Sequence, residues 1–457
     1  MMDMDAPLDF ESEDRLLNSV STKKRKKVIG LDDLLTDYYK EKGKLVERES
    51  KQAKARKSYN SDEDDDTTNE AKFSQCVDEC QQMMGQISDE IEISAWGIQM
   101  FGLQKPLPLL IFPELGGCRI LQSFMNNEFN SLVELSTENG ESFIKGLLVN
   151  GWLSKLVFTC GHVEKSVAIW TLNLMLYSPQ EDLRTSAWDF WHAILSSINE
   201  VDIRGVKIDW LPEYSDLKRA LDIYGFLFNF SSNSESVHDD SNCGPPQNIR
   251  AWIKYIAACC LLRGKHSIFS TSDAEELVVV IICLFLDRQL QGLSMLLFEC
   301  LLSIIGYFTD NEWNTSCKKI AKSLASRVPR DLNCLRTVEC ISGGNNRSKC
   351  LRSEVAYEIL VTCFDSKVTE AEEILRLLME INVKEKSCDL FKMYIYLVLT
   401  EHWLLSNPLF EAKPLIYEMW GVYLRNCSFQ ITGTDLRSYA SKVRTKAAYL
   451  LQGTVNR

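Results

Sequence analysis

Glycine, proline and histidine are all scarce in this chain of 457 residues, which has 22 glycines, 11 prolines and 5 histidines. Turns between short strands rely on glycine and proline, so a shortage of both favours long helices over sheets. Few histidines leave little scope for acid–base catalysis near neutral pH. Long hydrophobic runs are lacking too: the longest, 277–286, has ten residues, about half of a bilayer span. We expect this run to form a buried core helix.

The net charge has the wrong sign for binding nucleic acid by bulk attraction. The chain has 51 Lys and Arg against 63 Asp and Glu, a formal net charge of −12, whereas binding along phosphates needs clustered cations. Hydrophobic residues (45%) and charged residues (25%) occur in ordinary globular proportions. This composition excludes collagen, full disorder, a small disulfide scaffold and a membrane channel. The length permits several domains or one helical array.

The first residues and the cysteines indicate the compartment. The N-terminus is acidic and no apolar segment follows it, unlike a secretory signal. The 16 cysteines are scattered, and several lie in apolar stretches with helical spacing: Cys259, Cys260, Cys283, Cys300 and Cys363. Reduced cysteine packs as a small hydrophobe, so we expect an intracellular, reducing compartment.

Residues 1–70 differ in composition from the rest of the chain. They include 18 acidic and 14 basic residues but no tryptophan and no cysteine, so we expect a mostly disordered charged tail. The polar stretch 231–248, which contains Gly-Pro-Pro, predicts a loop. The predicted organisation is the tail, the first half of a helical body (71–230), this loop, and the second half of the body (249–457).

The remaining sequence predicts one helix after another. In 162–177, apolar residues including Val163, Val167 and Trp170 recur at helical spacing, and Pro179 marks the end of this helix. Further helical stretches are predicted at 180–198, 248–263, 273–308, 312–328, 355–364, 388–405, 412–425 and 435–451. No fixed repeat period is present. We predict an all-α fold of stacked helical hairpins, an irregular α-solenoid of HEAT-like type.

Two local predictions are more specific. Thr369 and Glu372 have the spacing of a capping box, which predicts that a helix begins there. The apolar stretch 107–112, with the sequence LPLLIF, predicts a strand.

Cysteine spacing does not indicate a metal site. Cys76 and Cys80 are one helical turn apart, but no second pair follows at zinc-finger spacing. Cys334, Cys340 and Cys350 also lack a partner pair. We interpret all five as ordinary thiols and expect no metal.

Catalytic and phosphate-binding motifs are missing as well. The glycine pairs at 116–117 and 343–344 do not match a phosphate loop and predict turns. We predict that His162 is a helix-start residue and that His192 is a partly buried core residue. We therefore expect no catalytic residue, no cofactor, no small-molecule substrate and no enzymatic activity.

The tail carries two short polar signals. Lys23, Lys24, Arg25, Lys26 and Lys27 form a run of basic residues typical of a nuclear import signal, which predicts a nuclear protein. The same run could instead contact phosphates or act as solubilising charge. Ser61 is followed directly by acidic residues, the context that acid-directed kinases favour, and is a candidate phosphosite.

Between these signals lies an amphipathic segment. Leu31, Leu34, Leu35 and Tyr38 follow the spacing of one helical face. Acidic residues begin this segment and lysines end it, as the helix dipole favours. A short amphipathic helix in a disordered tail is typical of a ligand for a partner's groove. The alternative is that it caps the chain's own helical body, and both readings remain open.

Parts of the chain resemble a known family. In the body, the resemblance lies in the order of a Trp- and Leu-rich helix, a small break, an Asp, and a Thr-Ser helix start. The residues that carry it are Trp170, Leu172, Met175, Leu176, Ser178, Asp182, Thr185, Ser186, Ala187 and Trp191. This pattern resembles the centre of the CANIN helical domain, found in the sixth non-SMC element of the Smc-five/six complex and its vertebrate counterpart. The tail sequence KKRKKVIGLDDLLTDYYKEKGKL resembles the plant version, a partner of the plant immune suppressor that serves as the fifth element.

The resemblance implies a nuclear, non-catalytic subunit. It would pair with the fifth non-SMC element, bind the SMC core subunits, and recruit or regulate the complex at damaged DNA and during recombination. The family offers no catalytic residues to transfer, and the Asp and Thr-Ser positions read as helix-start chemistry. DNA contact is expected to be indirect or weak, and no membrane contact is expected.

Two other classes of function compete with this one. The main alternative is a free HEAT-like helical adaptor, for example in transport, that is unrelated to SMC complexes. An enzyme on a helical scaffold is disfavoured because the sequence contains no catalytic or phosphate-binding motif.

Overall fold

The computed structural model describes residues 96–110, 137–199, 206–228, 244–364, 370–406 and 413–455. All of them belong to one compact unit, Met84–Arg457. The predicted tail lies outside the described residues, and with it the basic run at 23–27, the amphipathic segment at 31–38 and Ser61. Cys76, Cys80 and the glycine pair at 116–117 also lie outside them.

The prediction of an all-α fold is confirmed. The described residues form 15 α-helices, one 3₁₀ helix and one pair of two-residue strands. The α-helices are α4 (Thr137–Val149), α5 (Trp152–Cys160), α6 (Lys165–Tyr177), α7 (Glu181–Asn199), α8 (Tyr214–Ile223), α9 (Ile249–Cys260), α10 (Thr271–Phe285), α11 (Ser294–Tyr307), α12 (Asp310–Arg327), α13 (Leu332–Glu339), α14 (Asn346–Cys363), α15 (Ala371–Glu380), α16 (Leu390–Leu405), α17 (Pro414–Phe429) and α18 (Ala440–Val455).

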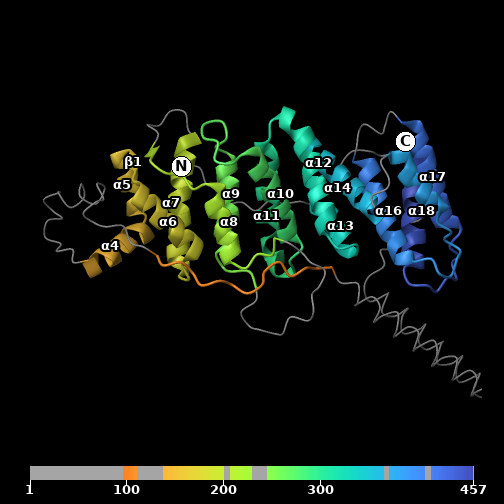
Figure 1. Cartoon of the computed structure of the whole chain (residues 1–457), viewed down its shortest axis with the longest axis horizontal. Coiled ribbons are helices and arrows are strands. Elements are labelled where there is room, and N and C mark those ends of the chain that lie inside the picture. The colour runs from red at the N-terminus through yellow and green to blue at the C-terminus, as the bar shows by residue number, and fades with distance from the viewer. Residues whose placement is uncertain are drawn as a thin grey trace, which may run out of the picture. The chain divides into compact units, whose positions relative to one another are not determined.

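Neighbouring helices pack in two ways. Several consecutive helices pack as pairs, including α6 with α7, α10 with α11 and α17 with α18. Helices two places apart also pack, which gives the rows α7–α9–α11 and α10–α12–α14–α16–α18. Figure 1 shows these helices side by side. Most helices therefore bury more than one face, which explains why the sequence has apolar residues on more than one side of a helix.

Local sequence explains where several helices begin. The Ser270 hydroxyl accepts a hydrogen bond from the Asp273 amide (3.2 Å), and the Asp273 carboxylate accepts one from the Ser270 amide (2.9 Å). Thr309 and Glu312 form the same reciprocal capping box at α12. Pro414 is the first residue of α17, where its missing N–H is not needed. These side chains satisfy amides that the start of a helix leaves unpaired.

The core is rich in aromatic side chains and thiols. The largest fully buried side chains include Trp170, Trp191, Trp252, Trp403 and Trp420. The apolar run 277–286 lies in α10 and its final turn and is buried along its whole length, as predicted. The helical, apolar positions predicted for the cysteines are confirmed: Cys259, Cys260, Cys283 and Cys300 are buried in α9, α10 and α11, and Cys363 ends α14.

One described stretch, the 3₁₀ helix η2 together with α11 (Arg288–Tyr307), is long and apolar enough to cross a membrane. The bent pair α4–α5 passes the same test if it is counted as one span. Core helices of globular proteins also pass it. Because α11 packs against α9, α10 and α14, we interpret its apolar content as core packing.

The helical stretch predicted at 273–308 is interrupted. α10 ends at Phe285, and η2 (Arg288–Leu293) intervenes before α11. Asp287 explains the break: its carboxylate accepts hydrogen bonds from the amides of Gln289 (2.9 Å) and Met100 (3.0 Å). Met100 is 187 positions away in the sequence, so local spacing could not reveal this contact.

The helix predicted at 162–177 begins later, because α6 starts at Lys165. His162 is not a helix-start residue. It forms strand β1 (His162–Val163), which pairs in parallel with strand β2 (Lys207–Ile208). Its Nε2 lies 2.8 Å from Asp209 Oδ2. The partner strand is distant in the sequence, and two residues are too few for a periodic pattern.

One local prediction is wrong for the described residues, and another is confirmed within one position. No strand forms at 107–110, and residues 111–112 lie outside the described residues. α15 begins at Ala371 after Glu370, whose side chain makes no capping hydrogen bond. A helix therefore starts within one position of the predicted cap, and Thr369 itself lies outside the described part of the chain.

His192 is also corrected. It is exposed, and its ring lies against Trp188, with 5.3 Å between ring centroids. Helical spacing placed it near the apolar face of α7, but the neighbouring Trp191 takes the buried position. The predicted turn at the glycine pair 343–344 agrees with the bend before α14.

Candidate functional site

An extended segment, residues 96–105, crosses the ends of several helices and is drawn in orange in Figure 1. The Gly97 amide donates to Asn333 Oδ1 at the start of α13 (2.7 Å), and the Ile98 amide donates to the Leu286 carbonyl after α10 (2.9 Å). Further along, the Lys105 amide donates to the Ile223 carbonyl at the end of α8 (2.8 Å). The segment therefore joins α8, α10 and α13.

Buried groups hold this segment in place. Met100 and Phe101 are fully buried, and the Phe101 ring packs edge to face on Phe226 (5.7 Å between centroids). Asp287, which binds the Met100 amide, is 3% exposed. Burial raises the pKa of this carboxyl from its ordinary 3.8, although the hydrogen bonds from the Met100 and Gln289 amides oppose the rise. The segment is part of the folded unit.

The α6–α7 pair contains most of the residues that carry the family resemblance. On α6, Trp170, Leu172, Met175 and Leu176 are buried. On α7, Trp191 is buried and packs edge to face on Tyr255 of α9 (5.6 Å between centroids). These residues form core, so their spacing reflects the packing of three helices.

The polar residues of the same pattern lie at the start of α7. Asp182 is exposed in the first turn of the helix, where a negative charge is favoured by the helix dipole. Thr185 is exposed one turn further along. Asn248, the residue before α9, donates through Nδ2 to the carbonyls of Met175 and Ser178 (both 3.1 Å), which fixes the link between α6 and α7.

The start of α7 forms one wall of an open cleft of about 750 Å³, which we call the α7–α9 cleft. Its other walls are α9, the turn before α9, and η2. The lining residues are Glu181, Arg184, Thr185, Trp188, Pro245, Pro246, Gln247, Ile249, Arg250, Ala251, Lys254, Gln289, Leu290, Gly292 and Leu293. The residue pairs Arg184–Trp188 and Arg250–Lys254 are each four positions apart, so each pair lies on one helix face.

The charge in this cleft is positive. Arg184 is 8% exposed, and among the described residues its guanidinium donates to the Ser178 carbonyl (3.3 Å) and Gln247 Oε1 (3.2 Å), both neutral acceptors. Lys254 Nζ lies 5.5 Å from the centroid of the Trp188 ring. Arg250 is exposed. Against these three cations, Glu181 is the one acidic residue in the lining.

The chemistry of the lining suits binding. The lining residues include no histidine and no cysteine, and Thr185 is the one hydroxyl among them. A nucleophile needs an adjacent base that activates it, and Glu181 is the one carboxylate present. Cations, amides and an indole ring can hold an anion that carries an apolar group. Sequence reasoning missed these residues, although the two spacings of four were visible signals.

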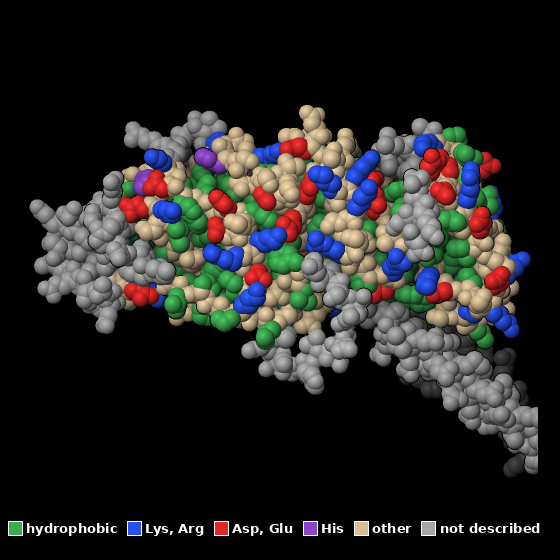
Figure 2. All heavy atoms as spheres, in the orientation of Figure 1, with side chains coloured by type: hydrophobic (Ala, Val, Ile, Leu, Met, Phe, Trp, Pro, Cys, Tyr) green, Lys and Arg blue, Asp and Glu red, His purple; other side chains and the backbone are tan. Residues whose placement is uncertain are grey.

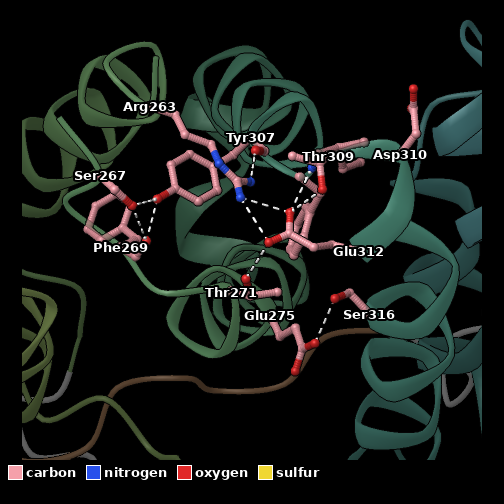
Figure 3. Close-up of polar contacts among 12 residues, drawn as sticks. Arg263, Ser267, Phe269, Thr271, Glu275, Tyr307, Thr309, Asp310, Glu312 and Ser316 are labelled. Carbon is pink, nitrogen blue, oxygen red and sulfur yellow. Dashed lines mark hydrogen bonds and ion pairs between the residues drawn. The ribbon is translucent and has the colours of Figure 1, made fainter. Parts of the chain in front are cut away.

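A second polar cluster, the Glu312 cluster, lies between α9, α10 and α12 (Figure 3). Arg263 donates through Nη2 to both oxygens of Glu312 (2.8 and 2.9 Å), and the Thr271 hydroxyl donates to Oε1 (2.8 Å). The amide and hydroxyl of Thr309 donate to Oε2 (2.8 and 2.7 Å). Arg263 also lies over the Tyr307 ring and donates to the Tyr307 carbonyl.

We interpret the Glu312 cluster as a structural link between helices. Hydrogen bonds from Thr309, then from Thr271 and Arg263, lower the pKa of Glu312 from 4.5 to about 2. A carboxylate whose oxygens are already occupied by these donors, and whose proton affinity is this low, is a poor general base. Its role is to join three helices, because its donors come from the segments that follow α9, begin α10 and precede α12.

Glu312→Gln is expected to lower the free energy of unfolding by about 1.5–3 kcal/mol at neutral pH, the scale of a charged hydrogen bond. The folded pKa of about 2 lies below the ordinary 4.5. The carboxylate therefore contributes fully above about pH 5, and its contribution is lost as the pH falls towards 2. Urea unfolding of wild type and variant should show a difference that shrinks with falling pH.

The matched control for that experiment is Glu299→Gln. Glu299 is exposed on α11, so this change should leave stability within about 0.5 kcal/mol of wild type at each pH. A Glu312→Gln effect that stays constant from neutral to acidic pH would contradict the role given to the ionised carboxylate.

Cysteines and metal ligands form no further site in the residues that the structure describes. No group of three or more His, Cys, Asp or Glu residues among them could hold a metal ion. Cys334 and Cys340 are buried, and burial raises the pKa of the Cys340 thiol to about 12. Cys350 Sγ lies 3.8 Å from Cys317 Sγ, so these two thiols are each other's partners.

Comparison of the chain with protein-family models and with curated proteins finds no match.

Proposed function

We propose that this chain is a non-catalytic nuclear subunit of the Smc-five/six complex, similar to the plant sixth non-SMC element of the CANIN-domain family. In this proposal it pairs with the fifth non-SMC element, binds the SMC core, and recruits or regulates the complex in DNA repair and recombination. It touches DNA weakly or through its partners, and it uses no cofactor and no small-molecule substrate.

The observation that best supports this proposal is the α6–α7 pair. It has a buried aromatic core around Trp170 and Trp191, and its exposed polar residues cluster at the start of α7. The α7–α9 cleft beside it is lined by binding groups rather than by an activated nucleophile. Cations, amides and an indole ring in this lining suit contact with another protein better than they suit catalysis.

The surface of the body also fits this role. Figure 2 shows Lys and Arg side chains interleaved with Asp and Glu side chains over one face. Interleaved charges do not make the basic stripe that binding along a phosphate backbone requires. This is consistent with indirect or weak DNA contact.

Mass spectrometry of the endogenous protein, purified through a small tag, tests the proposal. We expect SMC arm subunits and a second small helical subunit in stoichiometric amounts. Karyopherins or vesicle-coat proteins, without SMC subunits, would instead favour a free helical adaptor. The measured quantity is the set of proteins that copurify, so the test needs no activity assay.

Replacing Lys23, Lys24, Arg25, Lys26 and Lys27 by alanine is expected to reduce nuclear accumulation. Removing a basic import signal weakens recognition by import receptors, and a tail with little apolar content contributes little to folding. Imaging of a fluorescent fusion measures the nuclear fraction, and thermal unfolding of the purified variant should match wild type.

The import experiment needs cells that lack the partner subunits, because a bound partner could carry the variant into the nucleus. Replacing Lys51, Lys54, Arg56 and Lys57 by alanine is the control, since it removes charge from the same tail and leaves the five-residue run intact. Equal nuclear fractions for both variants and wild type in such cells would rule out the import signal.

A further inference from the structure

We propose that the α7–α9 cleft binds an acidic peptide segment that carries apolar side chains, supplied by a partner protein. This inference goes beyond the proposed function and holds whether or not the partner belongs to an SMC complex. It rests on three features of the cleft: an excess of positive charge, with three cations against the single carboxylate of Glu181, an apolar floor beside it, and an open geometry.

The excess positive charge is centred on Arg184. A guanidinium that is 8% exposed is costly to bury unless a negative charge lies nearby. Its two hydrogen-bond acceptors, the Ser178 carbonyl and the Gln247 amide oxygen, are both neutral. A carboxylate of a bound peptide would supply the missing charge, and Arg favours carboxylates because they accept two parallel hydrogen bonds.

Arg250 and Lys254 extend this positive charge along α9. In the part of the chain that the structure describes, no carboxylate forms an ion pair with either side chain, and Lys254 lies over the ring of Trp188. The chain as a whole has a net charge of −12. Three cations around one cleft in an acidic protein therefore form a local attraction for negative charge.

The apolar floor lies next to these cations. Trp188 is partly buried, and Pro245, Leu290 and Leu293 line the same cleft. Partly buried tryptophan beside arginine is typical of residues that contribute most of the energy in protein interfaces. An apolar side chain of the peptide would lie on this floor, while the neighbouring carboxylates face the cations.

The open geometry favours a peptide over a small anion or a nucleic acid. A free phosphate or carboxylate would leave most of about 750 Å³ unfilled and would not use Leu290 or Leu293. A nucleic acid would meet three cations in a protein of net charge −12, which gives few phosphate contacts. An acidic peptide with apolar residues uses both halves of the lining.

Fluorescence anisotropy with the full-length chain tests this inference. The probe is a fluorescein-labelled peptide of alternating aspartate and leucine, compared with the same peptide in which asparagine replaces aspartate. We expect the aspartate peptide to bind about tenfold or more tightly than the asparagine peptide at low salt, and the difference to shrink as salt is added. Equal binding of the two peptides would overturn the proposal.

The decisive variant is Arg250→Glu with Lys254→Glu, which should weaken binding of the aspartate peptide by about tenfold or more. Its matched control is Lys349→Glu with Arg425→Glu, which makes the same change at exposed positions on α14 and α17, outside the cleft. The control should bind as wild type does. Equal weakening by both double variants would show an effect of net charge alone and would overturn the proposal.

Further measurements test the role of the indole ring, the folding of the variants, and a nucleic acid as the alternative ligand. Trp188→Leu keeps an apolar side chain but removes the indole ring, so it should also weaken binding of the aspartate peptide. Thermal unfolding shows whether each variant is folded. An oligothymidine that binds more tightly than the aspartate peptide, and loses binding in Arg250→Glu with Lys254→Glu, would overturn the proposal in favour of a nucleic acid.

Discussion

Leu34→Asp with Leu35→Asp is expected to weaken binding to the SMC core by ~10²–10⁴-fold, with little change in the melting temperature of the chain alone. Both leucines lie on the amphipathic face that Leu31 and Tyr38 complete in the sequence. Burying one leucine contributes ~1.5–3 kcal/mol, and aspartate would also place charge in an apolar groove. Affinity for purified SMC core and thermal stability are measured on one preparation.

The same experiment separates the two readings of this segment. A helix this short is marginal in water, so we expect it to fold only when it is bound. If it binds a partner, affinity falls and stability does not change. If it caps the chain's own body, the melting temperature falls by several degrees and affinity stays the same. Asp32→Asn with Asp33→Asn is the control, since it changes the polar face of the same segment.

Trp191→Ala is expected to lower the free energy of unfolding by about 3–5 kcal/mol, the range for removing a large aromatic side chain from a core. Trp191 is fully buried between α7 and α9, where its ring packs edge to face on Tyr255. Its removal leaves a cavity at the contact of two helices that also form the α7–α9 cleft. Urea unfolding followed by circular dichroism measures the loss.

A surface variant and a conservative core variant serve as controls for Trp191→Ala. Trp152→Ala removes the same side chain from a surface position, 54% exposed, where Lys155 lies over the ring. It should cost within about 0.5 kcal/mol. Trp191→Phe keeps an aromatic ring at the core position and should cost less than alanine. Equal costs for Trp191→Ala and Trp152→Ala would contradict the packing described for α7.

The long buried helices were predictable because their signal is local. The apolar run 277–286 forms nearly all of the buried part of α10, and the stretch predicted at 180–198 matches α7 within one residue at each end. Helical periodicity is carried by residues within one element. It needs no knowledge of the partner helix, so the sequence shows it directly.

Features that depend on distant residues could not be predicted in this way. The break at Asp287 depends on the Met100 amide, and the strand at His162 depends on a partner after α7. The α7–α9 cleft is also of this kind. Arg184 and Arg250 are ordinary basic residues in the sequence, and only the packing of α7 against α9 brings them together.

Reconstitution from purified proteins tests most directly whether the chain is a subunit of the complex. The full-length chain, the fifth non-SMC element and the SMC core of the same organism are mixed and separated by size-exclusion chromatography. We expect the chain to form a stable pair with the fifth element, and we expect this pair to elute with the SMC core. A chain that elutes alone in both mixtures, while the fifth element still binds the core, would contradict the proposal that it is a subunit of the complex.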